Sequence, residues 1–220
     1  MMILKHGRVA PGSVRVVLAL AALLCSGCNG LSGPAGKEPA TLSLAAWNIQ
    51  ALFDGTDDGT EYGEYRHSAG WSAEKYRARL GAIAQALEGA GGKGPDLVAF
   101  MELENAGVLK SLAEDVLGDQ GYYWTAFGSN SELSLGLGVL SRYPISRTLT
   151  HSITINGETA PRPVLEVWIS PDGTAAEASS PVAEARPLVL FVCHWKSKLG
   201  GEDNTEGLRR AAARVAARRL

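Results

Sequence analysis

The sequence has few cysteines, no long hydrophobic run and no excess of positive charge. Three cysteines cannot form a disulfide framework, so the fold must depend on its hydrophobic core. The nine-residue apolar stretch 16–24 is too short to span a bilayer as a mature helix. The 21 basic and 23 acidic residues give a net charge of −2, which excludes a protein held to nucleic acid by bulk positive charge.

What the chain does contain is enough apolar sequence for one ordinary domain. Its 220 residues are 45% hydrophobic, so it can bury a core and is not disordered overall. The positive charge is concentrated near the two ends, because residues 1–27 carry three basic and no acidic side chains and residues 209–220 carry five arginines. The body between them is therefore acidic, which suits cation binding better than the wrapping of a polyanion.

The amino end has the pattern of an export signal. A basic segment, the apolar stretch and a group of small residues predict a signal peptide over residues 1–27. The tripeptide ending at Cys28 resembles the bacterial lipoprotein motif, so we expect Cys28 to be lipidated and the protein to be anchored to the membrane of the bacterial cell envelope. Ordinary cleavage and secretion is the alternative. Residues 28–40, rich in Gly, Pro and Ser, are expected to be a tether, and residues 41–220 one domain.

Hydrophobic patterns of strand and helix type alternate through this domain. A long acidic surface loop is expected over 54–70, and Ser72 offers a helix N-cap. Strands are expected over 41–49, 96–101, 122–127, 136–141, 145–155, 164–169 and 188–194, helices over 72–89, 106–117 and 204–220, and a hairpin connection over 171–186. This order predicts an α/β layered domain with its helices outside.

Polar side chains lie at the ends of four expected strands, where ligands bind in layered α/β domains. They are Asn48, Glu102, Arg162 and His194, with Lys196 and Lys198 following at a spacing of two.

Together these groups suit a divalent metal and a phosphate diester. The carboxylate of Glu102 can hold a hard cation such as Mg²⁺, while Arg162 would neutralise charge on the reacting phosphate. His194 could hydrogen-bond or protonate a phosphate oxygen near neutral pH. Each residue also has a structural alternative when it is taken alone. Glu102 could be a solvated carboxylate and Asn48 an ordinary turn residue. Arg162 could be a partner of Glu166, His194 a half-buried structural histidine, and the two lysines part of a solvated loop.

Five ordered blocks carry a resemblance to a known family. They read AAWNIQALFD, PDLVAFMELEN, GLGVLSRYPI, RPVLEV and LFVCHWKSK, and they span roughly residues 41–220. In this order they resemble the endonuclease/exonuclease/phosphatase superfamily, and within it the bacterial secreted nucleases related to deoxyribonuclease I. The resemblance implies a four-layer α/β sandwich, in which two mainly antiparallel sheets pack face to face between helices.

The resemblance also implies residue roles. Asn48 corresponds to a strand-end Asn that positions metal and phosphate, and Glu102 to the metal-ligating Glu, although Met101 stands where a Gln usually precedes it. Arg162 corresponds to a phosphate-contacting Arg and His194 to an active-site His. Lys196 and Lys198 would be cations on the phosphate side.

The same resemblance predicts that the sandwich is incomplete at the carboxy end. Family members continue into a Gly-Asp-x-Asn block and an Asp-His block, which supply the nucleophile-orienting groups and the general base. The sequence ends at Leu220, before both blocks. We therefore expect unpaired strand edges, and doubtful activity for the chain as written.

Three functions remain open on the sequence alone. The leading one is an exported, monomeric, Mg²⁺- or Mn²⁺-dependent endonuclease acting on DNA. The second keeps the fold but changes the substrate, as in a sphingomyelinase-like or inositol-phosphate phosphatase member. The third is an inactive truncated surface lipoprotein.

Overall fold

The computed structural model describes residues 41–89, 92–130, 135–160, 162–171, 187–198 and 201–219. The expected signal peptide, the tether and Cys28 lie outside these residues, as does most of the expected hairpin connection. Among the described residues, no helix combines the length and the apolar character needed to cross a membrane.

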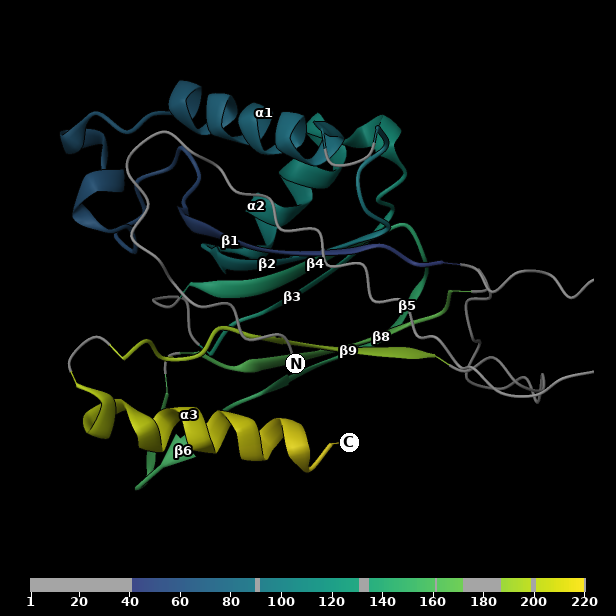
Figure 1. Ribbon diagram of the computed structural model, residues 1–220. Coiled ribbons are helices and arrows are strands. Elements are labelled where there is room, and N and C mark those ends of the chain that lie inside the picture. Colours follow the sequence, from purple (N-terminus) through teal and green to yellow (C-terminus); the bar gives the residue numbers. More distant parts are fainter. Residues whose placement is uncertain are drawn as a thin grey trace, which may run out of the picture.

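The described chain forms four layers (Figure 1). Helices α1 (Ala73–Gly89) and α2 (Ala106–Ser111) cover the first sheet, and α3 (Glu202–Ala217) covers the outer face of the second. The first sheet has the order β1-β2-β4-β3, with β1 Leu44–Leu52, β2 Leu97–Leu103, β4 Gly136–Ser141 and β3 Trp124–Gly128. The second has the order β5-β8-β9, with β5 Ile145–His151, β8 Val164–Ile169 and β9 Leu188–Cys193. A small hairpin of β6 (Thr154–Ile155) and β7 (Glu158–Thr159) lies beside α3.

The strand pairing is mainly antiparallel. Strand β1 runs parallel to β2, and every other paired strand in the two large sheets is antiparallel to its neighbour. The expected four-layer α/β sandwich is therefore confirmed.

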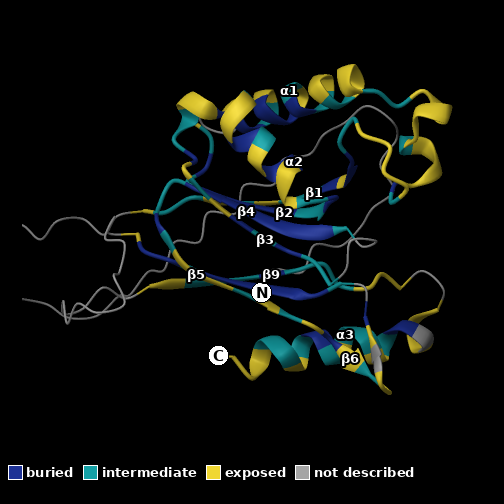
Figure 2. Ribbon diagram, turned by 180° about the vertical axis from the view of Figure 1, so that it is seen from behind, coloured by how far each residue is buried: buried dark blue, intermediate teal, exposed yellow. Residues whose placement is uncertain are grey.

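Buried side chains fill all three spaces between the layers, while the outer faces of the helices are exposed (Figure 2). Between α1, α2 and the first sheet the core includes Leu80, Phe100 and Leu109. Between the two sheets it includes Leu137 and Val167. Burial of this apolar area is the main stabilising contribution, at about 25 cal/mol per Å² removed from water.

Several boundaries differ from the expected ones. Strand β1 continues to Leu52, beyond the expected end at residue 49, and lies at the edge of its described sheet, where Leu44 is 38% exposed. The strand expected over 145–155 breaks after His151, and the remainder joins the β6–β7 hairpin. The helix expected over 106–117 is α-helical only to Ser111 and continues as a wider π-type turn at Leu112–Val116.

The start of α1 agrees with its predicted cap, because the Ser72 hydroxyl accepts a 3.3 Å hydrogen bond from the Lys75 N–H.

Candidate active site

Three of the predicted site residues meet at one point of the sandwich. The side-chain amide of Asn48 donates to Oε1 of Glu102 at 3.1 Å and lies 3.4 Å from Nε2 of His194. The same carboxylate oxygen of Glu102 lies 3.4 Å from that ring nitrogen. The structure therefore brings together a carboxylate, a carboxamide and an imidazole that are far apart in the sequence.

Both sheets contribute to this site. Asn48 is on β1 beside Met101 of the parallel strand β2, so Glu102, the next residue, comes close to it. His194 directly follows β9 of the second sheet. The side chains of Glu102 and His194 are 19% and 17% exposed, so water and a ligand can reach them while most of their surface is packed.

The backbone beside these residues is unusual. Gln50, Ala51 and Glu102 have φ angles of 58°, 57° and 71°, in the left-handed region that costs a non-glycine residue roughly 1–2 kcal/mol. The register between β1 and β2 shifts between Asn48 and Leu52. As a result, the Gln50 N–H donates to Oδ1 of Asn48 at 2.8 Å and the Ala51 N–H donates to Oε2 of Glu102 at 3.0 Å. The strained backbone thus holds both side chains of the site.

The donor set fits a hard divalent cation. Glu102 and Asn48 supply carboxylate and amide oxygens, which Mg²⁺ prefers, and Mg²⁺ commonly binds through one or two carboxylates plus water and substrate phosphate. Glu102 is partly exposed, so such outer ligands have access to it.

A cavity of about 240 Å³ lies beside His194. Arg162 and Lys196 line it together with His194, so it has a cationic side next to the site. Its other lining residues are aromatic or aliphatic: Tyr62, Leu135, Ile153, Ala160, Trp195, Leu208 and Ala212. The cavity can therefore receive an anionic group with an apolar portion.

Two expectations from the sequence differ from the structure: the place of Lys198, and the alternative that Arg162 is the partner of Glu166. Lys198 pairs with Glu202 at the exposed start of α3 and does not line the cavity. Glu166 does not use Arg162 as its partner, because Arg219, His151 and Trp168 bind its buried carboxylate. The phosphate-binding role of Lys198 remains a prediction.

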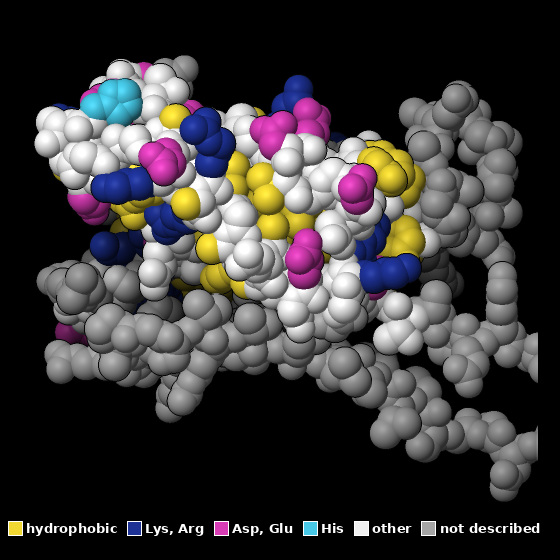
Figure 3. All heavy atoms as spheres, turned by 90° about the horizontal axis from the view of Figure 1, so that it is seen from above, with side chains coloured by type: hydrophobic (Ala, Val, Ile, Leu, Met, Phe, Trp, Pro, Cys, Tyr) yellow, Lys and Arg dark blue, Asp and Glu magenta, His cyan; other side chains and the backbone are white. Residues whose placement is uncertain are grey.

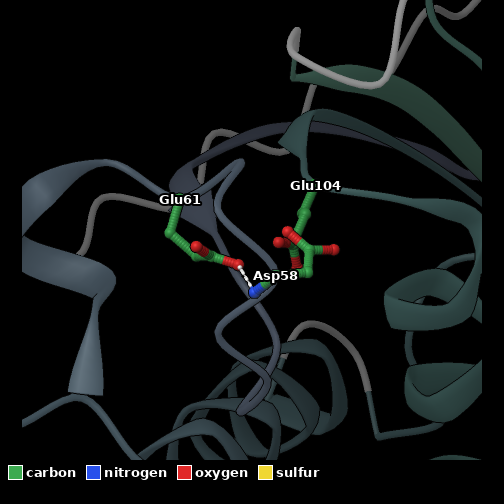
Figure 4. A group of neighbouring side chains, drawn as sticks. All are labelled: Asp58, Glu61 and Glu104. Atoms are coloured by element: carbon green, nitrogen blue, oxygen red, sulfur yellow. Dashed lines mark hydrogen bonds between the residues drawn. The ribbon is translucent and has the colours of Figure 1, made fainter.

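The structure contains a second group of acids, which was not predicted from the sequence (Figure 4). Its members stand near Asn48 and Glu102 in the sequence. Asp58, Glu61 and Glu104 can each offer one carboxylate oxygen to a common point, with these atoms within 4.8 Å of one another. Burial, the largest cause, and the nearby carboxylates of Asp54, Asp58 and Glu61 together raise the pKa of Glu104 to about 7, against the opposing effect of the hydrogen bond from the Asp54 N–H.

Glu61 corrects the expectation that the whole segment 54–70 is a surface loop. It is only 3% exposed, because its two oxygens accept hydrogen bonds from the backbone N–H groups of Asp58 and Gly59 at 2.7 and 2.9 Å. Burial alone would raise the pKa of Glu61, but these bonds hold it below its usual value. Two features of the sequence could have indicated this acidic group. One is the density of acids in segment 54–70, and the other is Glu104, which stands two residues after Glu102.

The surface near α1 is mixed in charge. Over the described part of the face in Figure 3, Lys and Arg side chains are interspersed with Asp and Glu, around a patch of hydrophobic atoms. This agrees with the net charge of −2 and indicates that any polyanion contact on this face is local.

The sequence matches the model of a known family. The chain belongs to the Endonuclease/Exonuclease/phosphatase family, whose model matches residues 43–220. Members of this family are hydrolases that act on phosphodiester bonds and generally use a divalent metal. The resemblance seen in the five sequence blocks is thereby confirmed at the level of the superfamily.

Solved structures similar to the chain include the following three. A D. rerio TDP2 humanized by 14 mutations has 16% identity and a TM-score of 0.48, covering 81% of this chain and 59% of that one. The human Nocturnin catalytic domain with bound sulfate has 14% identity and a TM-score of 0.47, covering 79% and 56%. Sphingomyelinase C from Streptomyces griseocarneus has 13% identity and a TM-score of 0.47, covering 83% and 61%.

The matched region thus spans less than two thirds of each of these structures. A search of curated proteins found no match to the sequence.

Proposed function

We propose that this protein is a metal-dependent phosphodiester hydrolase that cleaves DNA. The observation that carries the proposal is the convergence of Asn48, Glu102 and His194, which come from both sheets, within 3.1–3.4 Å of one another. A carboxylate that can hold a metal, with a neighbouring imidazole and nearby cations, can stabilise the negative charge that develops on a phosphate diester during hydrolysis.

Each residue has a role in this proposal. Glu102, with Asn48 beside it, would hold Mg²⁺ or Mn²⁺, which when bound withdraws charge from the phosphate oxygens. Arg162 and Lys196 bind and orient the anion from the wall of the cavity. Lys198 supplies a further positive charge outside the cavity. His194 is placed to donate a proton to a phosphate or leaving-group oxygen near neutral pH.

The reaction is an in-line hydrolysis. A water oxygen forms a new bond to phosphorus and releases one proton to the solvent, the bond from phosphorus to the leaving oxygen breaks, and that leaving oxygen takes up a proton. The contribution of the chain's own residues is to fix the phosphate in one orientation and to neutralise its charge.

A lipid or other organic phosphodiester is the second candidate substrate. The observation favouring it is the apolar wall of the cavity, which includes Leu135, Ile153 and Leu208 and can pack against a hydrophobic ester group. DNA is preferred because two cationic side chains, Arg162 and Lys196, line the same cavity as His194 and can bind a backbone phosphate.

The test is nicking of supercoiled plasmid by the full chain with Mg²⁺, with Mn²⁺ and with a chelator. We expect metal-dependent nicking that falls at least 100-fold in Glu102→Gln and is retained in Glu64→Gln, a matched change at an exposed acid. If neither Mg²⁺ nor Mn²⁺ supports nicking, the proposal that the protein cleaves DNA is wrong. Release of phosphocholine from sphingomyelin vesicles in that case would favour the second candidate.

We also propose that the protein is exported, anchored through a lipid on Cys28, and monomeric. The motif around Cys28 and the preceding apolar stretch support this location. Labelled palmitate should enter the wild type and Cys25→Ser but not Cys28→Ser, and equal labelling of both variants would contradict the proposed anchor.

A further inference from the structure

Arg79 of α1 lies directly against the strained end of β1. One of its terminal nitrogens, Nη2, donates to the carbonyl oxygens of Ile49 and Gln50, both at 2.6 Å. The other, Nη1, donates to the carbonyl oxygen of Ala51 at 2.9 Å. A single half-buried guanidinium group thus binds three consecutive carbonyl groups.

Tyr65 supports the same arrangement from the acidic loop. Its hydroxyl accepts a hydrogen bond from Nη1 of Arg79 at 3.2 Å and donates to the Gln50 carbonyl at 3.2 Å. The guanidinium carbon lies 5.7 Å from the centre of the Tyr65 ring. That ring stacks on Phe53 and meets the edge of Trp71, with centroids 4.8 and 5.0 Å away. Tyr65 is therefore itself fixed by packing.

The carbonyl groups bound by Arg79 and the amide groups that hold the site belong to the same short segment. The N–H groups of Gln50 and Ala51 donate to Asn48 and Glu102, respectively, while the carbonyls of both residues accept from Arg79. Gln50 and Ala51 are also the two residues of β1 with positive φ. A segment in such a conformation persists only where its surroundings stabilise it.

We infer that Arg79 is a positioning residue, which fixes the Gln50–Ala51 backbone so that its amide groups orient the side chains of Asn48 and Glu102. The role for metal binding rests on the proposed function, because it takes Glu102 and Asn48 as the ligands. Arg79 acts through the backbone, and its contribution is geometric.

The chemistry of the side chain explains why arginine stands at this position. The planar guanidinium presents several N–H donors in a fixed fork, so it can satisfy three carbonyl groups in one orientation. Lysine keeps the charge but offers a single compact ammonium group, which cannot reproduce this geometry. Arg79→Lys therefore removes the fork and retains the charge.

Arg77→Lys is a matched control. It is the same substitution on the same helix, two residues earlier, at an exposed position. Tyr65→Phe is a milder second variant, since it removes only the hydroxyl group that joins Arg79 to Gln50. Melting temperatures of the full chain and of each variant establish that the proteins compared are folded.

The first arm of the test needs no metal. Amide hydrogen exchange, followed by NMR well below the melting temperature, should be at least tenfold faster at Gln50 and Ala51 in Arg79→Lys than in the wild type. Tyr65→Phe should show a smaller change at the same two amides, and Arg77→Lys none. Unchanged exchange at both amides, or an increase spread evenly over β1 and α1, would overturn the inference in favour of a general structural role.

The second arm measures Mn²⁺ binding by electron paramagnetic resonance. Mn²⁺ should bind Arg79→Lys roughly tenfold more weakly than the wild type or Arg77→Lys, with rescue at higher Mn²⁺ concentration. Equal affinity in Arg79→Lys and the wild type would overturn the role in metal binding. If the wild type binds no Mn²⁺ while the amide exchange changes as expected, the proposed function fails and the orientation of Asn48 and Glu102 by Arg79 stands.

Discussion

At the scale of single residues, the site combines rare backbone angles with ordinary side-chain chemistry. Glu102 is a carboxylate at the carboxyl-terminal end of a strand, but its φ of 71° turns it out of the regular pleat. Its two oxygens are then oriented separately, one by the Asn48 amide and one by the Ala51 N–H. Such orientation of a ligand by its neighbours limits the motion of the site before any metal or substrate arrives.

Arg162 gives a prediction at this scale. Removing its guanidinium should weaken binding of a short DNA oligonucleotide about 10- to 100-fold, because a hydrogen bond to a charged group contributes roughly 1.5–3 kcal/mol. Fluorescence anisotropy of Arg162→Ala at fixed salt concentration measures this. Arg147→Ala is the control, because Arg147 packs over Trp168 and does not line the cavity. An equal loss of DNA affinity in both variants would contradict a specific role of Arg162, because any lost positive charge would then have the same effect.

Part of the site could be predicted residue by residue. Asn48, Glu102 and His194 each lie where an apolar strand pattern stops, and polar groups at such positions converge in an α/β domain. The sequence offered no comparable signal for Arg79, because its partners are backbone carbonyls on another element. Nor could it indicate Glu61, whose burial depends on how its own loop folds back.

At the scale of elements, the acidic loop and the start of α1 meet in close backbone contact. A Cβ atom placed on Gly55 would lie 2.5 Å from Cα and 2.8 Å from the backbone nitrogen of Ala73, the first residue of α1. Backbone atoms cannot move aside as a flexible side chain can. The loop can therefore reach its position beside the site only with glycine at this point.

Substitution of glycine should consequently have opposite effects at two positions. Gly55→Ala should destabilise the protein by roughly 1–3 kcal/mol, as overpacking does. Gly81→Ala, in the middle of α1 with open space around it, should stabilise it by roughly 0.5–1 kcal/mol through helix propensity. Urea denaturation compares the two. A stable Gly55→Ala variant would contradict the close contact between loop and helix.

The elements themselves were predictable where the local pattern and the packing agree. Gly136–Ser141 and Val164–Ile169 have the expected bounds, because both strands are almost entirely buried and their sequences are mostly apolar. The pattern failed at 145–155, where a continuous strand-like sequence is interrupted so that the β6–β7 hairpin can pack beside α3. That interruption is imposed by tertiary contact and is not encoded in the local periodicity.

At the scale of the whole molecule, one buried carboxylate ties α3 to the second sheet. Glu166 of β8 is 1% exposed and accepts hydrogen bonds from Arg219, just beyond α3, at 2.8 and 3.0 Å. His151 of β5 and Trp168 of β8 bind the same carboxylate at 2.7 and 2.6 Å. The hydrogen bonds from Arg219, with those from Trp168 and His151, lower the pKa of Glu166 to about 2 against the opposing effect of burial.

The pH dependence of stability follows from this shift. Because the pKa in the folded state lies below the usual value of 4.5, the stabilisation is fully present above that value and is lost as the pH falls towards 2. The wild type should therefore melt at a higher temperature than Glu166→Gln above pH 5, and the gap should close between pH 4.5 and 2. A gap that stays constant across this range would contradict the account.

A matched surface pair serves as the control for this pH series. Glu206 pairs with Arg210 on the exposed side of α3, with both side chains largely in solvent. Such pairs contribute little to stability, so Glu206→Gln should melt close to the wild type at every pH.

The position of the metal is the central claim, and binding of Mn²⁺ to the full chain tests it most directly. A titration followed by electron paramagnetic resonance should show one Mn²⁺ per chain, with affinity at least tenfold weaker in Glu102→Gln and unchanged in Asp58→Asn. The second variant removes a charge from the neighbouring acidic group of Asp58, Glu61 and Glu104. Loss of binding in Asp58→Asn with full retention in Glu102→Gln would contradict the account and place the metal in that acidic group.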